Sequence, residues 1–149
     1  MTASLHIQAQ ADAPIACDMS TAQDTPNERL SAYTRLFESA LMRRERRDDA
    51  VVLWFRADAG TRDAVDELAR REAACCPFLD YHVETIDNEV IWTISHASTG
   101  DRRASVAVIL DATYALTDHA YSNLDSHLEG LTDRGIHITE TGDGFELRE

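Results

Sequence analysis

Apolar and polar residues recur along the chain with two different periods, and these periods separate helices from strands. Helical spacing predicts a helix from about Asn27 to Met42, with Thr25 as the rival N-cap, and a second helix over Thr61–Cys75 that Pro77 ends. The apolar positions that define these helical faces are Leu30, Tyr33, Leu36, Phe37, Ala40 and Leu41 in the first helix and Ala64, Val65, Leu68 and Ala69 in the second.

Short runs of β-branched and aromatic residues predict the strands. Val51–Phe55 is the clearest run, because it is apolar throughout and is bounded by charge. Two further strands, around Tyr81–Val83 and over Val90–Ile94, flank Asp87-Asn88, a pair typical of hairpin turns. The sequence therefore predicts an antiparallel hairpin in the middle of the chain.

Two segments before these strands carry weaker patterns. Leu5 and Ile7 alternate with polar neighbours, which favours a short strand there or, failing that, an extended N-terminal arm over residues 1–26. Residues 43–49 hold four Arg against three acidic residues, a nearly neutral mixture. We interpret this mixture as a solvated helix end and turn rather than a nucleic-acid patch.

The C-terminal third of the chain predicts two helices and a hairpin. Helical spacing returns over residues 101–116 and 118–133, and Gly135 is a typical stop signal. The stretch from Ile136 to Leu147 has the pattern of a small hairpin around Gly142-Asp143-Gly144.

The predicted order is helix, strand, helix, strand, strand, helix, helix and hairpin. This order favours an α+β fold of two layers, with a mostly antiparallel sheet packed against helices. A chain of 149 residues is expected to form a single domain, 1–149.

Charge narrows the range of functions. The chain carries a formal net charge of −13, and all 14 of its basic residues are arginine. The absence of lysine excludes Schiff-base chemistry and a P-loop lysine. The negative charge argues against nucleic acid and against an anionic membrane surface as partners. Because neither a signal peptide nor a membrane-spanning run is visible, we expect a cytoplasmic protein.

The three cysteines are Cys17, Cys75 and Cys76. An odd number of cysteines in a reducing compartment does not predict a disulfide framework. Adjacent Cα atoms are ~3.8 Å apart, below the usual ~4.4 Å minimum for a bridge, so Cys75 and Cys76 are poorly placed to bond to each other. A bond from Cys17 to one member of the pair stays open.

Glu72 is the most informative polar residue, because it interrupts the apolar stripe of Val65 and Leu68. It also precedes the cysteine pair by three and four positions, which places it on the same side of the last helical turn. A carboxylate on a core-facing stripe must be paired, protonated or coordinating. The simplest interpretation is a helix edge at which Glu72 reaches solvent or pairs with Arg43, Arg44 or a neighbour.

Two functional interpretations compete for this cluster. In the first, Cys17, Cys75 and Cys76 bind a thiophilic ion such as zinc, mercury or arsenite, with His82 as an optional fourth ligand. In the second, Cys75 or Cys76 is a nucleophile, and Glu72 or His82 is its acid/base partner. Buried cysteines that only pack are the structural alternative to both.

The polarity of the helix favours a bound ion over a free thiolate. The C-terminal end of a helix carries partial negative charge, which disfavours a thiolate there, and a bound cation cancels that penalty. Adjacent helical side chains diverge by ~100°. Both sulfurs can therefore reach one centre only if the chain unwinds at Cys76, and Pro77 favours that unwinding.

The segment Glu72-x-x-Cys75-Cys76-Pro77-Phe78-Leu79, between a helix and a hairpin, resembles a group of small bacterial proteins with an E-x-x-C-C-[PS]-F signature. Three features extend the resemblance over about residues 15–116: Cys17 in an Ala-Cys-x-Met context, a helix carrying Arg29 and Tyr33, and a strand ending at Phe55. Similar segments look to be appended to regulators of the mercury-resistance type. The resemblance thus implies heavy-metal or metalloid handling and groups the three cysteines; residues 117–149 are a C-terminal extension outside it.

The sequence leads to three hypotheses about function. The first is soft metal or metalloid binding by Cys17, Cys75 and Cys76, for sequestration, delivery or sensing, with Glu72 handling protons. The second is a small thiol-dependent enzyme with Cys75 or Cys76 as nucleophile and Glu72 as acid/base, so enzyme and binding protein both stay open. The third is an interaction module, a homodimer whose N-terminal arm pairs across the interface.

Overall fold

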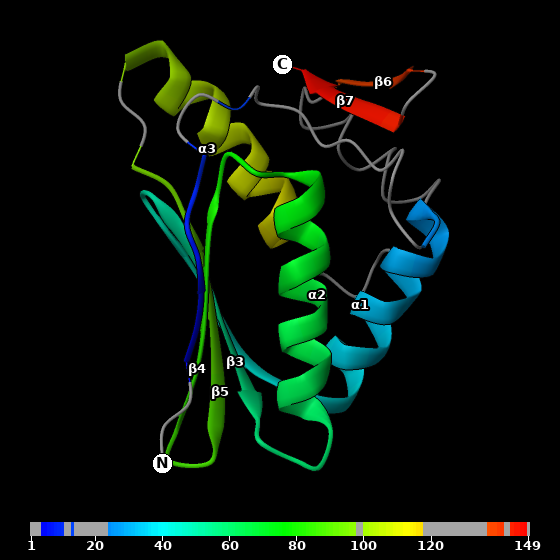
Figure 1. Ribbon diagram of the computed structural model, residues 1–149, viewed down its shortest axis with the longest axis vertical. Coiled ribbons are helices and arrows are strands. Elements are labelled where there is room, and N and C mark those ends of the chain that lie inside the picture. The colour runs from blue at the N-terminus through cyan, green and yellow to red at the C-terminus, as the bar shows by residue number, and fades with distance from the viewer. Residues whose placement is uncertain are drawn as a thin grey trace.

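The computed structural model describes residues 4–10, 13, 24–97, 100–117, 137–141 and 144–148. Five strands form one antiparallel sheet in the order β1-β4-β5-β3-β2, and helices cover one of its faces, which confirms the α+β class (Figure 1). The elements of this layer pair are β1 Ser4–Ile7, α1 Pro26–Ala40, β2 Leu41–Arg47, β3 Ala50–Arg56, α2 Thr61–Cys75, β4 Asp80–Ile86, β5 Glu89–Ser95 and α3 Gly100–Ala115. A separate two-stranded sheet pairs β6 His137–Thr141 with β7 Gly144–Arg148.

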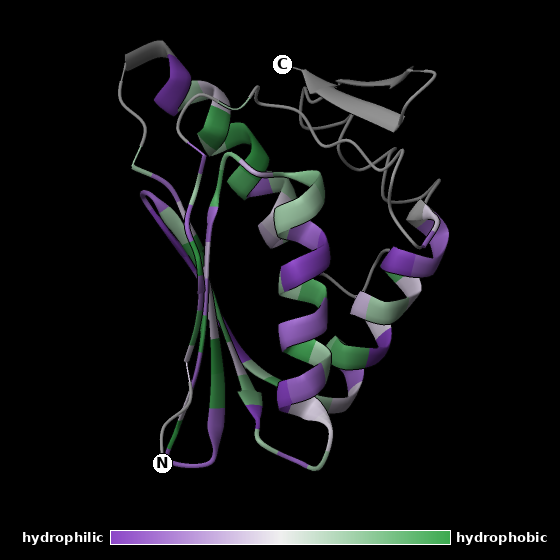
Figure 2. Ribbon diagram, in the orientation of Figure 1, coloured by the Kyte–Doolittle hydropathy of each residue, from purple (hydrophilic) through white to green (hydrophobic). Residues whose placement is uncertain are grey.

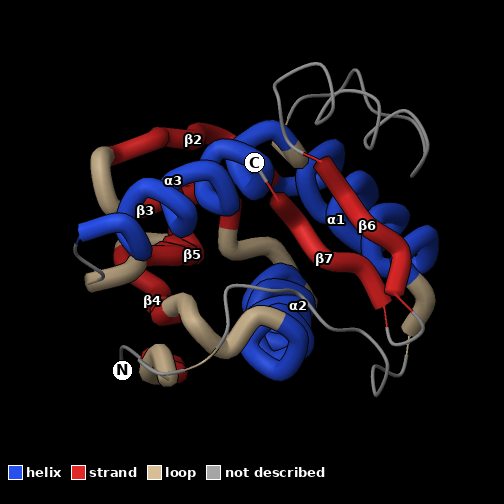
Figure 3. The backbone as a smooth tube through the Cα atoms, turned by 90° about the horizontal axis from the view of Figure 1, so that it is seen from above, coloured by secondary structure: helices blue, strands red, loops and turns tan. Residues whose placement is uncertain are grey.

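The core lies between the sheet and the three helices. Seen from above, α1 and α2 lie side by side while α3 lies over β2 and β3 (Figure 3). Trp92 on β5 is fully buried and stacks on Tyr33 of α1, with ring centroids 6.0 Å apart. The middle of α3 is apolar (Figure 2), and its Val106 and Leu110 are also fully buried. Burying these side chains supplies the main driving force for the two-layer packing.

A capping box fixes the start of α1. The Thr25 side chain accepts from the backbone N–H of Glu28 at 3.1 Å, and the Glu28 carboxylate accepts from the backbone N–H of Thr25 at 3.0 Å. Two helical N–H groups that would otherwise lack partners are satisfied in this way. Thr25, the rival in the sequence prediction, is therefore the N-cap, and Asn27 lies inside the helix.

The prediction of a helix end and turn over residues 43–49 is wrong for most of that segment, because Leu41–Arg47 is strand β2. The charged residues pair with the apolar strand β3 and place their long side chains over neighbouring groups. Arg43 stacks on Trp54 at 4.0 Å, and Arg44 lies over Tyr114 at 4.7 Å. Pairing with a buried strand outweighs the local charge pattern, since strand formation depends strongly on context.

The central hairpin is confirmed. Asp87 and Asn88 have φ values of 50° and 65°, both left-handed, as a two-residue type I′ turn between β4 and β5 requires. The N-terminal strand is also confirmed, since β1 pairs with β4 of the same chain.

The predicted C-terminal elements have different outcomes. Strands β6 and β7 confirm the final hairpin, and α3 confirms the helix at residues 101–116. The predicted helix at residues 118–133 lies outside the described residues. Within the described ranges, no helix has the length and apolar character needed to cross a membrane.

Candidate functional site

The C-terminal end of α2 presents the cysteine pair. The helix ends at Cys75, and Cys76 adopts φ −126° and ψ 69°, which is not helical. Its backbone N–H still donates to the Glu72 carbonyl at 2.6 Å, and the Tyr81 hydroxyl donates to its carbonyl at 3.1 Å. The unwinding at Cys76 that the sequence predicts is therefore present, and Tyr81 on β4 holds it in place.

The two adjacent cysteines differ in chemical state. Cys75 is a free thiol, whereas Cys76 is disulfide-bonded, and each residue is only 4% exposed. The sequence does not predict a disulfide framework, but it leaves open a bond from Cys17 to one member of the pair. Cys17, the third predicted ligand, lies outside the described residues.

Arg29, in the first turn of α1, connects the groups around Cys75. Its Nε and Nη2 atoms donate to the two carboxylate oxygens of Asp24 at 2.6 and 2.7 Å, and its Nη1 donates to Glu72 Oε1 at 2.8 Å. Its Nη2 also lies 3.7 Å from Cys75 Sγ. Arg29 is 5% exposed, so this cation is buried, and Glu72 is a half-buried partner with 21% of its side chain exposed. A buried arginine needs such pairing, and its planar group can satisfy several acceptors at once.

Glu72 lies between Arg29 and the second cysteine. Its partner is Arg29 of α1, not Arg43 or Arg44, because those two side chains lie over Trp54 and Tyr114. Glu72 Oε2 lies 4.0 Å from Cys76 Sγ. A disulfide sulfur has no proton to donate, so this is a contact in the oxidised form and becomes a potential proton path only after reduction.

Burial and charge set the protonation states at the site. Burial raises the pKa of the Cys75 thiol, and the neighbouring Arg29 only partly opposes this effect. The hydrogen bond from Arg29 lowers the pKa of Asp24. Burial, reinforced by the Glu72 charge, raises the pKa of Tyr33 well above 10.0. At neutral pH the site therefore contains the protonated Cys75 thiol, the ionised Asp24 carboxylate and the neutral Tyr33 phenol.

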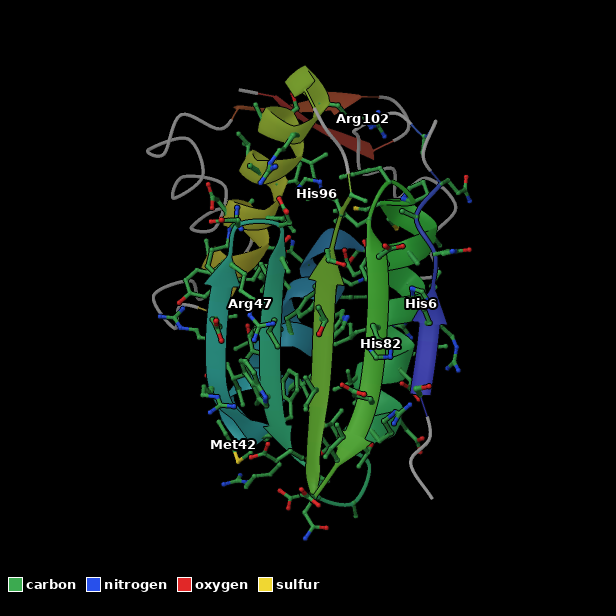
Figure 4. All side chains as sticks on the ribbon, turned by 90° about the vertical axis from the view of Figure 1, so that its left-hand side faces the viewer. His6, Met42, Arg47, His82, His96 and Arg102 are labelled. Atoms are coloured by element: carbon green, nitrogen blue, oxygen red, sulfur yellow. The ribbon has the colours of Figure 1, made fainter. Side chains whose placement is uncertain are left out.

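The structure places His82 away from the cysteines. Its neighbours on β4, Tyr81 and Val83, are buried on the helix-covered side, so alternation directs His82 to the opposite face of the sheet. There it contacts His6 of β1, with ring centroids 5.7 Å apart (Figure 4). In the part of the chain that the structure describes, no group of three His, Cys, Asp or Glu side chains could hold a metal ion.

Sequence reasoning missed two residues of the site. Arg29 entered only through the family resemblance, as a feature of a helix, and Asp24 did not enter at all. The signal for Arg29 is not local, because its partner Glu72 lies 43 residues away. Asp24 binds Arg29, five residues away, and Arg71, 47 residues away, but it lies outside every periodic pattern of the sequence. The carboxylate on the apolar stripe, at position 72, was the indication in the sequence that a distant cation would pack against α2.

Comparisons with family models, with curated proteins and with solved structures find no match to this chain.

Proposed function

We propose that this protein binds a thiophilic metal or metalloid through Cys17, Cys75 and Cys76, and that the redox state of Cys76 controls access to the site. The observation that carries the proposal is the difference between two adjacent cysteines, one free and one disulfide-bonded. The chain has three cysteines, so Cys17 is the remaining candidate for the partner of Cys76. Such a pairing would bring the third sulfur to the end of α2, next to Cys75.

Reduction would convert this arrangement into a ligand set. A dithiol reductant supplies two electrons and two protons, the Cys76 disulfide becomes two thiols, and the reductant becomes a disulfide. Three thiols then react with arsenite, As(OH)3, to form three As–S bonds and release three waters. Zn(II) or Hg(II) instead displaces three protons. Three thiolates and one divalent ion carry a net charge of −1, which the Arg29 guanidinium near Cys75 would balance.

Glu72 and Arg29 have complementary parts in this proposal. Glu72 Oε2, 4.0 Å from Cys76 Sγ, would accept a proton as the thiol becomes a ligand. Arg29 stabilises negative charge on Cys75 against the effect of burial. Metal affinity is then expected to rise with pH, since each thiol must lose its proton.

We also place the protein in the cytoplasm as part of this proposal. Disulfides in a reducing compartment are usually transient and are used for catalysis or redox sensing. The oxidised Cys76 would therefore be the closed state of a sensing site, and reduction would open it to an ion.

The test uses full-length protein prepared in oxidised and in reduced form. Each form is titrated with arsenite, Hg(II) and Zn(II), while free thiols are counted and sulfur-to-metal absorption is recorded. We expect the reduced form to bind one ion per chain with loss of all three reactive thiols, and the oxidised form to bind far more weakly. Cys17→Ser should remove the disulfide and weaken binding. Three thiols that stay reactive in the presence of every ion would rule the proposal out.

The contact between Arg29 and Cys75 favours a second candidate, a small thiol-dependent enzyme. A guanidinium beside a cysteine is one way to activate a nucleophile, and Glu72 could act as acid/base. The raised pKa of Cys75 opposes this function in the oxidised form. In reduced protein, one thiol alkylated much faster than the others near neutral pH would support it. Uniformly slow alkylation would exclude it.

A further inference from the structure

The sheet has a second face that no described helix covers. The helices contact the sheet on the side of the core, and Figure 4 shows the opposite side, with His6, Arg47 and His82 labelled on it. We call this surface the open face. Its residues follow from the pairing register, because directly paired residues of neighbouring antiparallel strands point to the same side.

Three rows of paired residues cross the open face from β2 towards β1, and each begins with a charged residue. The rows are Arg43–Trp54–Ile91–Glu84–Ser4, Glu45–Val52–Thr93–His82–His6 and Arg47–Ala50–Ser95–Asp80. From the first row to the third, the β2 residue is basic, then acidic, then basic. In the same order, the β4 residue is acidic, then histidine, then acidic. Apolar side chains of β3 and β5 lie between the two ends.

This pattern is complementary to itself. A two-fold axis that lies between two copies, runs parallel to the strands and passes midway between β3 and β5 turns one open face onto the other and leaves β1 at the margin of the contact. This rotation places β2 of one copy opposite β4 of its partner. Each row of one copy faces the same row of the other, because positions along the strand direction do not change. Arg43 of one copy then faces Glu84 of its partner, and Glu45 faces His82. Closed two-fold contacts of this kind use one surface twice, and stacked sheets pack about 10 Å apart.

Exposed apolar side chains fit the same arrangement. In the described ranges the exposed large hydrophobic residues are Met42 and Ile86, at 45% and 40%. Ile86 continues the outward positions of β4, and Met42 lies in β2 at the same end of the sheet, where the pairing register shifts (Figure 4). The two-fold operation brings Ile86 of one copy towards Met42 of the other. Two apolar groups that a monomer leaves in water would then be covered.

We propose that the open face binds the open face of a second copy of this chain. The result is a face-to-face homodimer in which the strands of both copies run parallel to the two-fold axis. The proposal does not depend on the thiol site. It also differs from a dimer formed by exchange of the N-terminal arm, because β1 already pairs with β4 of its own chain.

The Arg43–Glu84 contact provides the sharpest test, because the Asp80 carboxylate already accepts from the Ala9 N–H at 2.5 Å. Arg43→Glu and Glu84→Arg each place like charges opposite each other twice per dimer. Like-charge contacts of this kind weaken association strongly. We expect each variant alone to dimerise at least about tenfold more weakly than wild type. Sedimentation over a concentration series measures the change, against a chain mass of 16.6 kDa.

Mixing the two variants distinguishes a surface contact from damage to the fold. In the mixed dimer the new carboxylate meets the new guanidinium, and the second contact keeps its natural pair. Dimerisation should therefore return only in the mixture. Arg70→Glu, an exposed arginine on α2, is the matched control and should leave the dimer intact. A wild-type chain that stays monomeric at every concentration would overturn the proposal. So would variants that dimerise alone as well as wild type does, since another surface would then hold the dimer.

Discussion

The guanidinium of Arg29, at the start of α1, lies 3.7 Å from the sulfur of Cys75, at the end of α2. Because the same guanidinium also binds Asp24 and Glu72, one cation joins the segment before α1 to the cysteine-bearing end of α2. The environment of the thiol is therefore set by a residue 46 positions earlier in the chain.

Arg29→Gln should strongly destabilise the fold. The variant leaves the carboxylates of Asp24 and Glu72 without their main cation, and breaking a buried pair in this way costs about 3–5 kcal/mol. Urea unfolding measures the loss. Arg71→Gln is the matched control, because Arg71 is 34% exposed and its ion pairs are expected to contribute about 1 kcal/mol or less. Equal losses in the two variants would contradict the central position of Arg29.

Asp24 should make the protein sensitive to acid. The hydrogen bond from Arg29 lowers the pKa of Asp24 below its ordinary 3.8, so the folded state binds this proton less readily than the unfolded chain does. The resulting stability is present above pH 3.8 and is lost as the pH falls through the lowered pKa. Asp24→Asn should lower the unfolding free energy at neutral pH by about 2 kcal/mol. It should also make the unfolding free energy fall less steeply as the pH is lowered into the acid range. If the unfolding free energy of Asp24→Asn depends on acid pH as steeply as that of wild type, this assignment is wrong.

His96 should weaken the fold over a higher pH range. Burial lowers the pKa of His96 below 6.5, against the opposing charge of Asp49, so the unfolded state takes up this proton first. Stability contributed by the neutral imidazole is then lost as the pH falls from 6.5 towards the lowered pKa. An NMR titration of the imidazole checks the direction of the shift. A His96 pKa at or above 6.5 in the folded protein would disprove the prediction.

Asn88 tests the turn of the central hairpin. Its φ of 65° is left-handed, a conformation that asparagine tolerates and alanine resists. Asn88→Ala should lower the unfolding free energy by about 1 kcal/mol. Asn88→Gly should preserve or slightly raise it, because glycine is the preferred second residue of a type I′ turn. Thermal unfolding of the pair gives the comparison, and a lower stability for the glycine variant would argue against this turn geometry.

Local patterns predicted those elements whose formation depends on nearby residues. Thr61–Cys75 is the second helix as expected, because its apolar spacing and Pro77 act within a few residues of each other. Leu41–Arg47 was misread, because its conformation depends on pairing with a buried strand and not on its own charges. Tertiary pairing of this kind overrides local propensity.

The candidate site shows the same division. The sequence located Glu72, Cys75 and Cys76 together, since they lie within five consecutive residues at the end of α2. It could not supply Arg29, because the contact of Arg29 with Glu72 joins separate elements and leaves no periodic trace in one sequence. Asp24 binds Arg29 from only five positions away, but the segment before α1 carries no periodic pattern that would indicate the pair. A charged residue on an apolar face shows that a partner is needed, but it does not show which residue the partner is.

The arginine-rich strand β2 has a further consequence for aggregation. It forms one edge of the sheet, and β1 forms the other. Five of the seven β2 residues are charged, so a foreign strand pairing there would have to desolvate a row of arginines. The other edge offers only the four residues of β1. Neither edge of the five-stranded sheet is a favourable template for added strands, so we do not expect this sheet to extend into fibrils through its edges.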